Sequence, residues 1–246
     1  MDRWKYYAIT HRDHAVLNPT SPAKLDELAQ LFDLRANASV LDIACGKGEV
    51  LLHVLERYRC AGVGVDLSPY FIRDARERAL ARLPRAKIEL REGDGAAYDG
   101  ARESFDLVMC LGASWIWQGH RGTLTALARW AKPGGLVLAG EPFWAREPEA
   151  DYLAAIECTR EMFGTHEANV RCGVELGLTP LHAMVSNGDD RDRYEGLQWR
   201  AAETWADANP DDPDRSEVLT QCRRYRDAYL RSGRDTLGWA LYLFRK

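Results

Sequence analysis

The sequence has few of the features that mark membrane, secreted or zinc-binding proteins. No apolar run in its 246 residues approaches the ~20 residues that a membrane span needs. The N-terminal Met-Asp-Arg-Trp-Lys has no apolar segment behind it, unlike a secretory leader. The six cysteines include no Cys-x-x-Cys pair, which argues against a zinc ribbon or a thioredoxin-type site. We therefore expect a cytoplasmic protein with reduced thiols and no membrane partner.

The chain also lacks a strong excess of either charge. Lys and Arg number 33 against 37 Asp and Glu, for a net charge of −4. Proteins that bind nucleic acids usually carry a basic surface, so we expect no nucleic-acid partner. Hydrophobic residues make up 46% of the chain and charged residues 28%, which excludes a largely disordered or fibrous protein. The length fits one α/β domain, as a monomer or a homodimer.

Short apolar segments alternate with helical patterns over the first 150 residues. Strands are predicted at 39–44, 61–66, 87–92, 105–111 and 135–140, and helices from residue 21, at 49–58, at 68–83 and at 122–131. This alternation predicts βαβ units with right-handed crossovers. The expected fold is α/β, a doubly wound, mostly parallel sheet with helices on both faces.

The last hundred residues are less regular. Helices are expected at 151–163, 201–208 and 216–230, and strands at 181–186 and 239–244. The simplest arrangement is one domain, 1–246. It comprises an N-terminal cap with the first helix (1–38), a core (39–144) and a helical insertion before the last strand (187–235).

Three successive predicted strands each end near a carboxylate. Asp42 precedes the small-residue turn 45–48, where the backbone can approach a ligand closely and the next helix offers free N–H groups. Asp66 follows about 20 residues later, as recognition of a ribose diol requires. Asp94 comes after the third strand and could accept a hydrogen bond from the adenine amine. Ligands of such sheets bind beyond the carboxyl ends of the strands. The pattern describes a site for a nucleoside with a charged amino-acid tail.

These segments resemble the class I S-adenosylmethionine-dependent methyltransferases over roughly residues 39–144. The matching pieces are VLDIACGKGE (40–49), GVDLS (64–68), EGDGA (92–96), FDLV (105–108) and KPGG (132–135). Gly-Glu-Pro-Phe-Trp (140–144), Gly-Ala-Ser-Trp (112–115) and the His-x-x-x-Asn-Pro segment (14–19) are similar to a small bacterial group of these enzymes. The resemblance implies a seven-stranded, Rossmann-like sheet with an antiparallel last strand.

The resemblance also implies S-adenosyl-L-methionine as cofactor and assigns residues to it. Asp42, Gly46 and Gly48 would hold the methionine end, Asp66 the ribose and Asp94 the adenine. Neighbouring candidates on the same turns and strand ends are Ala44, Cys45, Leu67, Gly95, Ala96 and Leu111. The family usually has Gly where this chain has Ala44, and we expect the turn to survive with less freedom.

The acceptor should lie above the ends of the fourth and fifth strands, under the N-terminal cap. We expect direct displacement onto a small molecule, with Glu141 as a base or a site for an acceptor cation and His14 as the second candidate base. Glu141 could equally hold the cap through a hydrogen bond. Trp115 and Trp144 could form an aromatic wall around the acceptor or simply pack in the core. The Asn/Asp-Pro-Pro-aromatic motif of nucleic-acid amino methyltransferases is missing.

Two other function classes stay open. One is a non-catalytic S-adenosylmethionine-binding module that regulates a partner. The other is a NAD-dependent dehydrogenase, which shares the glycine turn and the ribose acid but would need a full G-x-G-x-x-G motif. We expect no metal site, because His11 and His14 have no third ligand nearby.

Overall fold

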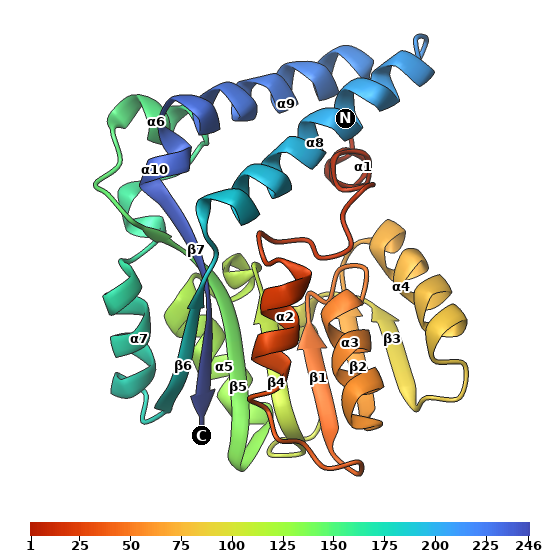
Figure 1. Ribbon diagram of the computed structural model, residues 1–246, viewed down its shortest axis with the longest axis vertical. Coiled ribbons are helices and arrows are strands. Elements are labelled where there is room, and N and C mark those ends of the chain that lie inside the picture. Colours follow the sequence, from red (N-terminus) through yellow and green to blue (C-terminus); the bar gives the residue numbers. More distant parts are fainter.

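Seven strands form one mixed sheet in the computed structural model, which describes all residues 1–246, in the order β3-β2-β1-β4-β5-β7-β6 (Figure 1). Adjacent strands from β3 to β5 are parallel, whereas β7 is antiparallel to both of its neighbours. The strands are β1 (Ser39–Ile43), β2 (Ala61–Asp66), β3 (Ile88–Glu92), β4 (Phe105–Leu111), β5 (Ala131–Trp144), β6 (Thr179–Val185) and β7 (Leu237–Arg245). The predicted seven-stranded α/β sheet with an antiparallel last strand is confirmed.

Helices cover both faces of this sheet because side chains alternate along each strand. On β4, Leu107 and Met109 enter one core and Val108 and Cys110 enter the other. The first core is closed by α2 (Pro22–Ala29) and α3 (Glu49–Tyr58), and the second by α5 (His120–Trp130) together with the segment around α7 (His166–Glu175). Helix α4 (Pro69–Arg82) packs beside β2 and β3.

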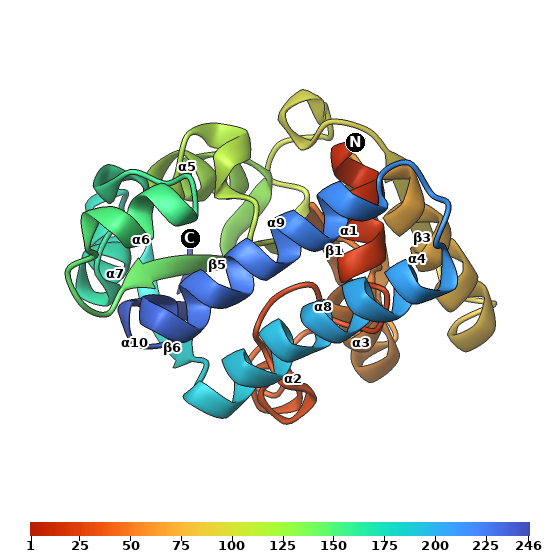
Figure 2. The same ribbon diagram turned by 90° about the horizontal axis from the view of Figure 1, so that it is seen from above.

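Three further helices lie across the carboxyl ends of the parallel strands (Figures 1 and 2). They are α1 (Arg3–Thr10), α8 (Gly188–Ala208) and α9 (Arg215–Ala228), which we call the cap. The cap has a small core of its own, made of Tyr6, Ile9, Ala202, Val218 and Cys222. Segments far apart in the sequence thus meet above the sheet, where ligands of such folds bind.

The remaining elements are short. They are α6 (Ala150–Ala155), α10 (Arg234–Thr236), the 3₁₀ turns Gly95–Ala97, Ser114–Trp117 and Arg160–Met162, and a π turn at Tyr229–Gly233. No helix has the length and apolar composition needed to cross a membrane.

Several predicted elements differ from the structure in the C-terminal half. The helix expected at 151–163 ends at Ala155, because Glu157 has a left-handed backbone (φ 56°) that stops it. Helix α7 was not predicted, since its pattern is weakly amphipathic and Val174 is exposed. Helix α8 begins at Gly188 rather than near 201, because Asn187 and Asp190 form a capping box.

Candidate functional site

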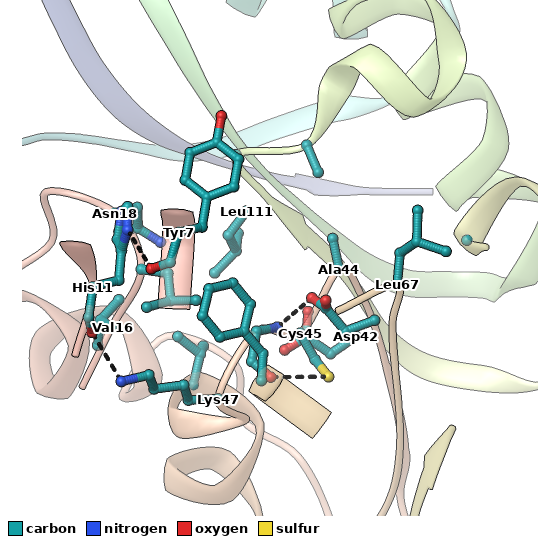
Figure 3. A pocket seen from close by; sticks show the side chains of 18 of the residues that line it. Tyr7, His11, Val16, Asn18, Asp42, Ala44, Cys45, Lys47, Leu67 and Leu111 are labelled. Carbon is teal, nitrogen blue, oxygen red and sulfur yellow. Dashed lines mark hydrogen bonds between the residues drawn. The ribbon is translucent and has the colours of Figure 1, made fainter. Parts of the chain in front are cut away.

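A cavity of about 250 Å³ opens at the carboxyl ends of β1, β2 and β4, under α1. Most of the residues predicted for the cofactor line this first cavity: Asp42, Ala44, Cys45, Gly46, Asp66, Leu67, Asp94, Gly95 and Leu111. Gly48 and Ala96 do not line it, although their chain neighbours Lys47, Glu49 and Gly95 do. Figure 3 shows Asp42, Ala44 and Leu67 on one side of the cavity and Tyr7, His11, Val16 and Asn18, from the N-terminal segment, on the other.

The turn between β1 and α3 is held in an unusual backbone conformation. Ala44, Gly46 and Gly48 all have positive φ angles, of 58°, 56° and 72°. At Gly46 an added Cβ would also lie 2.7 Å from Cδ1 of Leu17, so that side chain would have to move. Glycine fits both demands, and Ala44 is accommodated at a position that L-residues rarely adopt. The turn therefore exposes main-chain atoms, with few side-chain atoms around them, to the cavity.

The carboxylates of the cavity differ in their partners. Asp66 accepts hydrogen bonds from the backbone N–H groups of Gly46 and Ser68, both at 2.8 Å. Burial raises the pKa of Asp66, and these N–H groups oppose the rise. Asp42 is 2% exposed and accepts no hydrogen bond from the chain, so burial, and then the charge of Asp66, raises its pKa well above the usual range. Asp94 accepts from the N–H of Ala96 at 2.8 Å. Acceptors for a ligand's cation and hydroxyls are thus in place.

The cap is tied to the glycine turn by Lys47, a contact that the sequence pattern did not reveal. Its Nζ donates to the carbonyls of His11 (2.8 Å) and Arg12 (3.1 Å), just beyond the carboxyl end of α1. A cation at that end of a helix also interacts favourably with its dipole. From the same helix, the Arg3 guanidinium lies 5.2 Å from the centre of the Trp115 ring. Helix α1 therefore closes one side of the first cavity.

A second cavity, of about 340 Å³, adjoins the first. The two share Leu17, Asn18, Gly112 and Tyr194 in their walls. The second cavity is rich in aromatic side chains, namely Tyr152, Phe163, Tyr194, Tyr225, Tyr229 and Trp239. Two charged side chains, Arg191 and Glu195 of α8, also line it.

Tyr194 stands at the junction of the two cavities and is bonded to a cap histidine. Its hydroxyl lies 2.8 Å from Nε2 of His11. The other nitrogen, Nδ1, lies 3.0 Å from Oγ1 of Thr10 and 3.2 Å from the carbonyl oxygen of Tyr7. The Tyr194 hydroxyl also donates to the backbone carbonyl of Leu17 at 3.3 Å. Burial lowers the pKa of His11 to about 3, which keeps the ring neutral.

Comparison with known proteins identifies the family of this two-cavity site. Residues 40–135 match the family model described as a methyltransferase domain. A crystal structure of a SAM-dependent methyltransferase from Thiobacillus denitrificans, in complex with S-adenosyl-L-homocysteine, is 34% identical, with a TM-score of 0.91 over 99% of each chain. A Geobacter sulfurreducens structure described in the same words is 30% identical, with a TM-score of 0.91 over 98% of this chain and 97% of that one. This chain belongs to the SAM-dependent methyltransferase family.

A third relative also spans the methyltransferase from end to end. The uncharacterized protein YjhP of Escherichia coli K12 is 29% identical over 245 residues, 98% of each chain. The predicted cofactor, S-adenosyl-L-methionine, is confirmed by these relatives. The site fits it, since Asp42 offers an unpartnered buried carboxylate and Gly46, with a positive φ of 56°, presents backbone without a side chain. The comparisons favour neither the dehydrogenase nor the non-catalytic module.

The expected aromatic wall is wrong for one of its two tryptophans. Trp144 is 3% exposed and lines neither cavity. Its Nε1 donates to the carbonyl of Arg160 at 2.8 Å, and its ring packs against Phe163, at 5.4 Å between centroids. Its side chain therefore anchors the segment after α6. Trp115 does line the first cavity and is 51% exposed.

The two expected bases lie behind the cavity walls in the methyltransferase. Glu141 is 2% exposed, accepts from Ser114 Oγ at 3.0 Å and lies 4.0 Å from Nδ1 of His120. Burial raises its pKa to about 8. His14 Nε2 donates to the backbone carbonyl of Tyr194 at 2.9 Å. Neither side chain lines either cavity. Glu141 thus holds the turn at Ser114, and it makes no hydrogen bond to the cap that it was alternatively expected to hold.

Proposed function

We propose that this methyltransferase transfers a methyl group to a small molecule held in the second cavity. The observation that carries this proposal is the junction of the two cavities, whose walls share residues from the N-terminal segment, the end of β4 and α8. An acceptor in the second cavity would face a cofactor in the first. A volume of about 340 Å³ suits a small ligand rather than a polymer. The net charge of −4 supports the absence of a nucleic-acid partner.

The reaction we propose is a direct displacement. Bound S-adenosylmethionine supplies a methyl group activated by the sulfonium charge. The protein chiefly holds the acceptor in line with that methyl group, a contribution that can reach ~7–11 kcal/mol. Asp42 and the turn at Gly46 would hold the amino-acid end, and Asp66 and Asp94 the nucleoside, with Ala44, Cys45, Leu67, Gly95 and Leu111 lining the rest. Gly48 and Ala96 would act by shaping the backbone around them.

Tyr194 is the residue we propose to orient the acceptor. Its hydroxyl is held between His11 and the carbonyl of Leu17, and its oxygen keeps a lone pair that can accept a hydrogen bond from the methyl acceptor. His14 holds the backbone of Tyr194 and is assigned a positioning role. Glu141 is also a positioning residue, because it fixes Ser114 beside the first cavity. Trp115 would close the cavity from outside together with Arg3.

We infer that the Gly-Glu-Pro-Phe-Trp segment (140–144) shapes the second cavity, which Pro142 lines. A Cβ on Gly140 would lie 2.7 Å from the ring of Trp239, so glycine there lets that ring lie across β5. Trp239 lines the second cavity and donates from Nε1 to Thr20 at 3.3 Å. Together with the Trp144 anchor, the segment positions the wall that an acceptor would contact.

The test is a methyl-transfer assay with three acceptor classes: a panel of small amines, alcohols, phenols and carboxylic acids; tRNA and DNA; and unfolded protein. We expect S-adenosylhomocysteine to form only with small molecules. Tyr194→Phe should lower kcat about tenfold, the loss of one hydrogen bond in the transition state, without changing the affinity for S-adenosylhomocysteine. Tyr70→Phe, on α4 and outside both cavities, is the matched control. Turnover with nucleic acid or protein and none with small molecules would refute the proposal.

A further inference from the structure

Glu195 is a carboxylate in the second cavity with no partner in the chain. It follows Tyr194 on α8 and lines the second cavity, yet no hydrogen bond or ion pair within the protein involves it. Arg191, one helical turn earlier and in the wall of the same cavity, donates its terminal N–H groups to the backbone carbonyls of Leu237 and Arg234 and leaves its Nε without a partner. A charge left unpaired in an enclosed site is costly, which points to a ligand that completes it.

Aromatic rings surround this carboxylate. Tyr152, Tyr229 and Trp239 are buried, and all three line the second cavity. Burial raises the pKa of Tyr152, Tyr194 and Tyr229, and the charge of Glu195 adds to the rise in each, so the carboxylate lies among these phenols. The hydroxyl of Tyr152 makes no hydrogen bond within the chain. Aromatic faces attract cations, and more strongly where water is excluded.

We propose that Glu195, among Tyr152, Tyr194 and Tyr229, binds the ammonium group of the methyl acceptor, so that the substrate is a small amine methylated on nitrogen. This inference rests on the proposed function, and names its substrate class. A carboxylic acid would meet the like charge of Glu195. An alcohol or a phenol would leave that charge uncompensated.

The same geometry gives Glu195 a part in the reaction. The ammonium group passes one proton to the carboxylate, which frees the nitrogen lone pair. That lone pair forms the new N–C bond while the C–S bond breaks, and the bonding electrons go to sulfur. The product leaves as an N-methylammonium ion, and Glu195 returns its proton to water. Burial raises the pKa of Glu195 to about 7, opposed by Arg191, which suits proton exchange near neutral pH.

No other titratable group of the second cavity is suited to bind the ammonium group and accept its proton. Tyr225 and Tyr229 approach from α9 and the turn after it, Tyr152 and Cys158 from the segment around α6, and Arg191 and Tyr194 from α8 itself. Burial raises the pKa of Cys158, Tyr152 and Tyr229, so these groups stay neutral. Glu195 is therefore the one anion that faces the second cavity.

The experiment measures binding to the full chain saturated with S-adenosylhomocysteine, so that the cofactor site is occupied throughout. The probes are pairs that differ in charge but little in shape: benzylamine and benzyl alcohol, tyramine and 4-hydroxyphenethyl alcohol, choline and 3,3-dimethylbutan-1-ol, with benzoic acid added. The variants are Glu195→Gln, Glu195→Asp and the control Glu203→Gln. Glu203 lies on the same helix but is paired with Arg223 at 2.8 Å, outside the second cavity.

The best amine should bind about tenfold tighter than its uncharged partner, a typical gain for a charge-assisted contact. Glu195→Gln should remove that preference while leaving S-adenosylhomocysteine binding unchanged, which also shows that the variant folds. Glu195→Asp and Glu203→Gln should keep the preference for the amine over its uncharged partner. Calorimetry near pH 7 in buffers of different ionisation enthalpy should show proton release on amine binding to wild type and none to Glu195→Gln.

The remaining outcomes decide between the two proposals. If alcohols or acids bind as well as amines, or if Glu195→Gln keeps the preference, the amine inference is wrong. Methylation of those alcohols or acids by wild type would then leave the proposed function standing. If no probe binds and no small molecule is methylated, although S-adenosylhomocysteine does bind, both proposals fall.

Discussion

The carboxylates of Asp42 and Asp66 lie at the ends of neighbouring strands, and only that of Asp66 is hydrogen-bonded within the chain. Their strands pair in parallel, with Asp42 opposite Gly64. Asp66 caps the backbone of Gly46 and Ser68, so it supports the glycine turn as well as facing the cavity. Asp42 has no such structural partner, which makes it the cleaner probe of cofactor binding.

Asp42→Asn should separate cofactor affinity from stability. Removing a buried, unpartnered charge should raise the free energy of unfolding of the free protein by about 1–2 kcal/mol at pH 7. The affinity for S-adenosylhomocysteine should fall at least about tenfold, because the amide carries no charge to pair with the ligand's ammonium group. Denaturant unfolding and calorimetry measure the two effects, and Asp26→Asn, on the exposed surface of α2, is the control. An unchanged affinity would remove Asp42 from the cofactor site.

Ala44→Gly should stabilise the turn, because Ala44 has a left-handed backbone with φ of 58°. A left-handed conformation costs an L-residue roughly 1–2 kcal/mol, and glycine avoids that cost. Glycine also gives the unfolded chain more conformational freedom, which stabilises the unfolded state. We therefore expect the free energy of unfolding to rise by a net amount of about 0.5–1 kcal/mol. Ala79→Gly, inside helix α4, should instead destabilise by about 1 kcal/mol. Urea unfolding of both variants checks the prediction, which a loss of stability in Ala44→Gly would contradict.

The contact between Arg3 and Trp115 should slow the escape of cofactor. The guanidinium lies 5.2 Å from the ring centre, and both residues line the first cavity. Cation–π pairs at exposed sites contribute about 0.5–1 kcal/mol, so Arg3→Ala should raise the dissociation rate of S-adenosylhomocysteine about two- to fivefold. Stopped-flow displacement measures this rate. Arg57→Ala removes a comparable contact, with Tyr58 at 5.8 Å on α3, and should leave it unchanged.

Glu141 should make stability fall as pH rises. Burial raises its pKa from 4.5 to about 8, so the folded chain keeps a proton that the unfolded chain loses. The contribution of protonated Glu141 to the free energy of unfolding is complete below about pH 4.5 and disappears as the pH approaches 8. The neighbouring His120 has its pKa lowered to about 4 by burial, so it stays neutral over most of this range.

Glu141→Gln tests that prediction, because glutamine resembles the protonated acid. Relative to wild type, the variant should gain on the order of 3 kcal/mol in unfolding free energy between about pH 5 and pH 8. Chemical denaturation at several pH values gives the comparison. Glu203→Gln, at an exposed ion pair, should show no such trend. A difference that does not vary with pH would mean that Glu141 is ionised in the folded protein.

Local patterns were sufficient for the core of the fold. Helix α3 and strands β2 and β4 have the predicted bounds, because apolar periodicity and turn residues delimit them directly. The segments around α6 and α7 were mispredicted because their ends depend on a left-handed Glu157 and on packing against the sheet. A capping box at Asn187 and Asp190 was present in the sequence and could have placed the start of α8.

The sequence by itself determined the cofactor half of this methyltransferase. Its turn and its carboxylates sit at the ends of consecutive parallel strands, so short-range order along the chain brings them to one edge of the sheet. The second cavity, where we propose that the acceptor binds, was decided only by tertiary structure. His11 and Tyr194 are 183 positions apart, yet they are hydrogen-bonded above the sheet. Which face of α8 turns inward depends on how the cap packs, so no local pattern could distinguish Glu195 from the solvent-facing acids of the same helix.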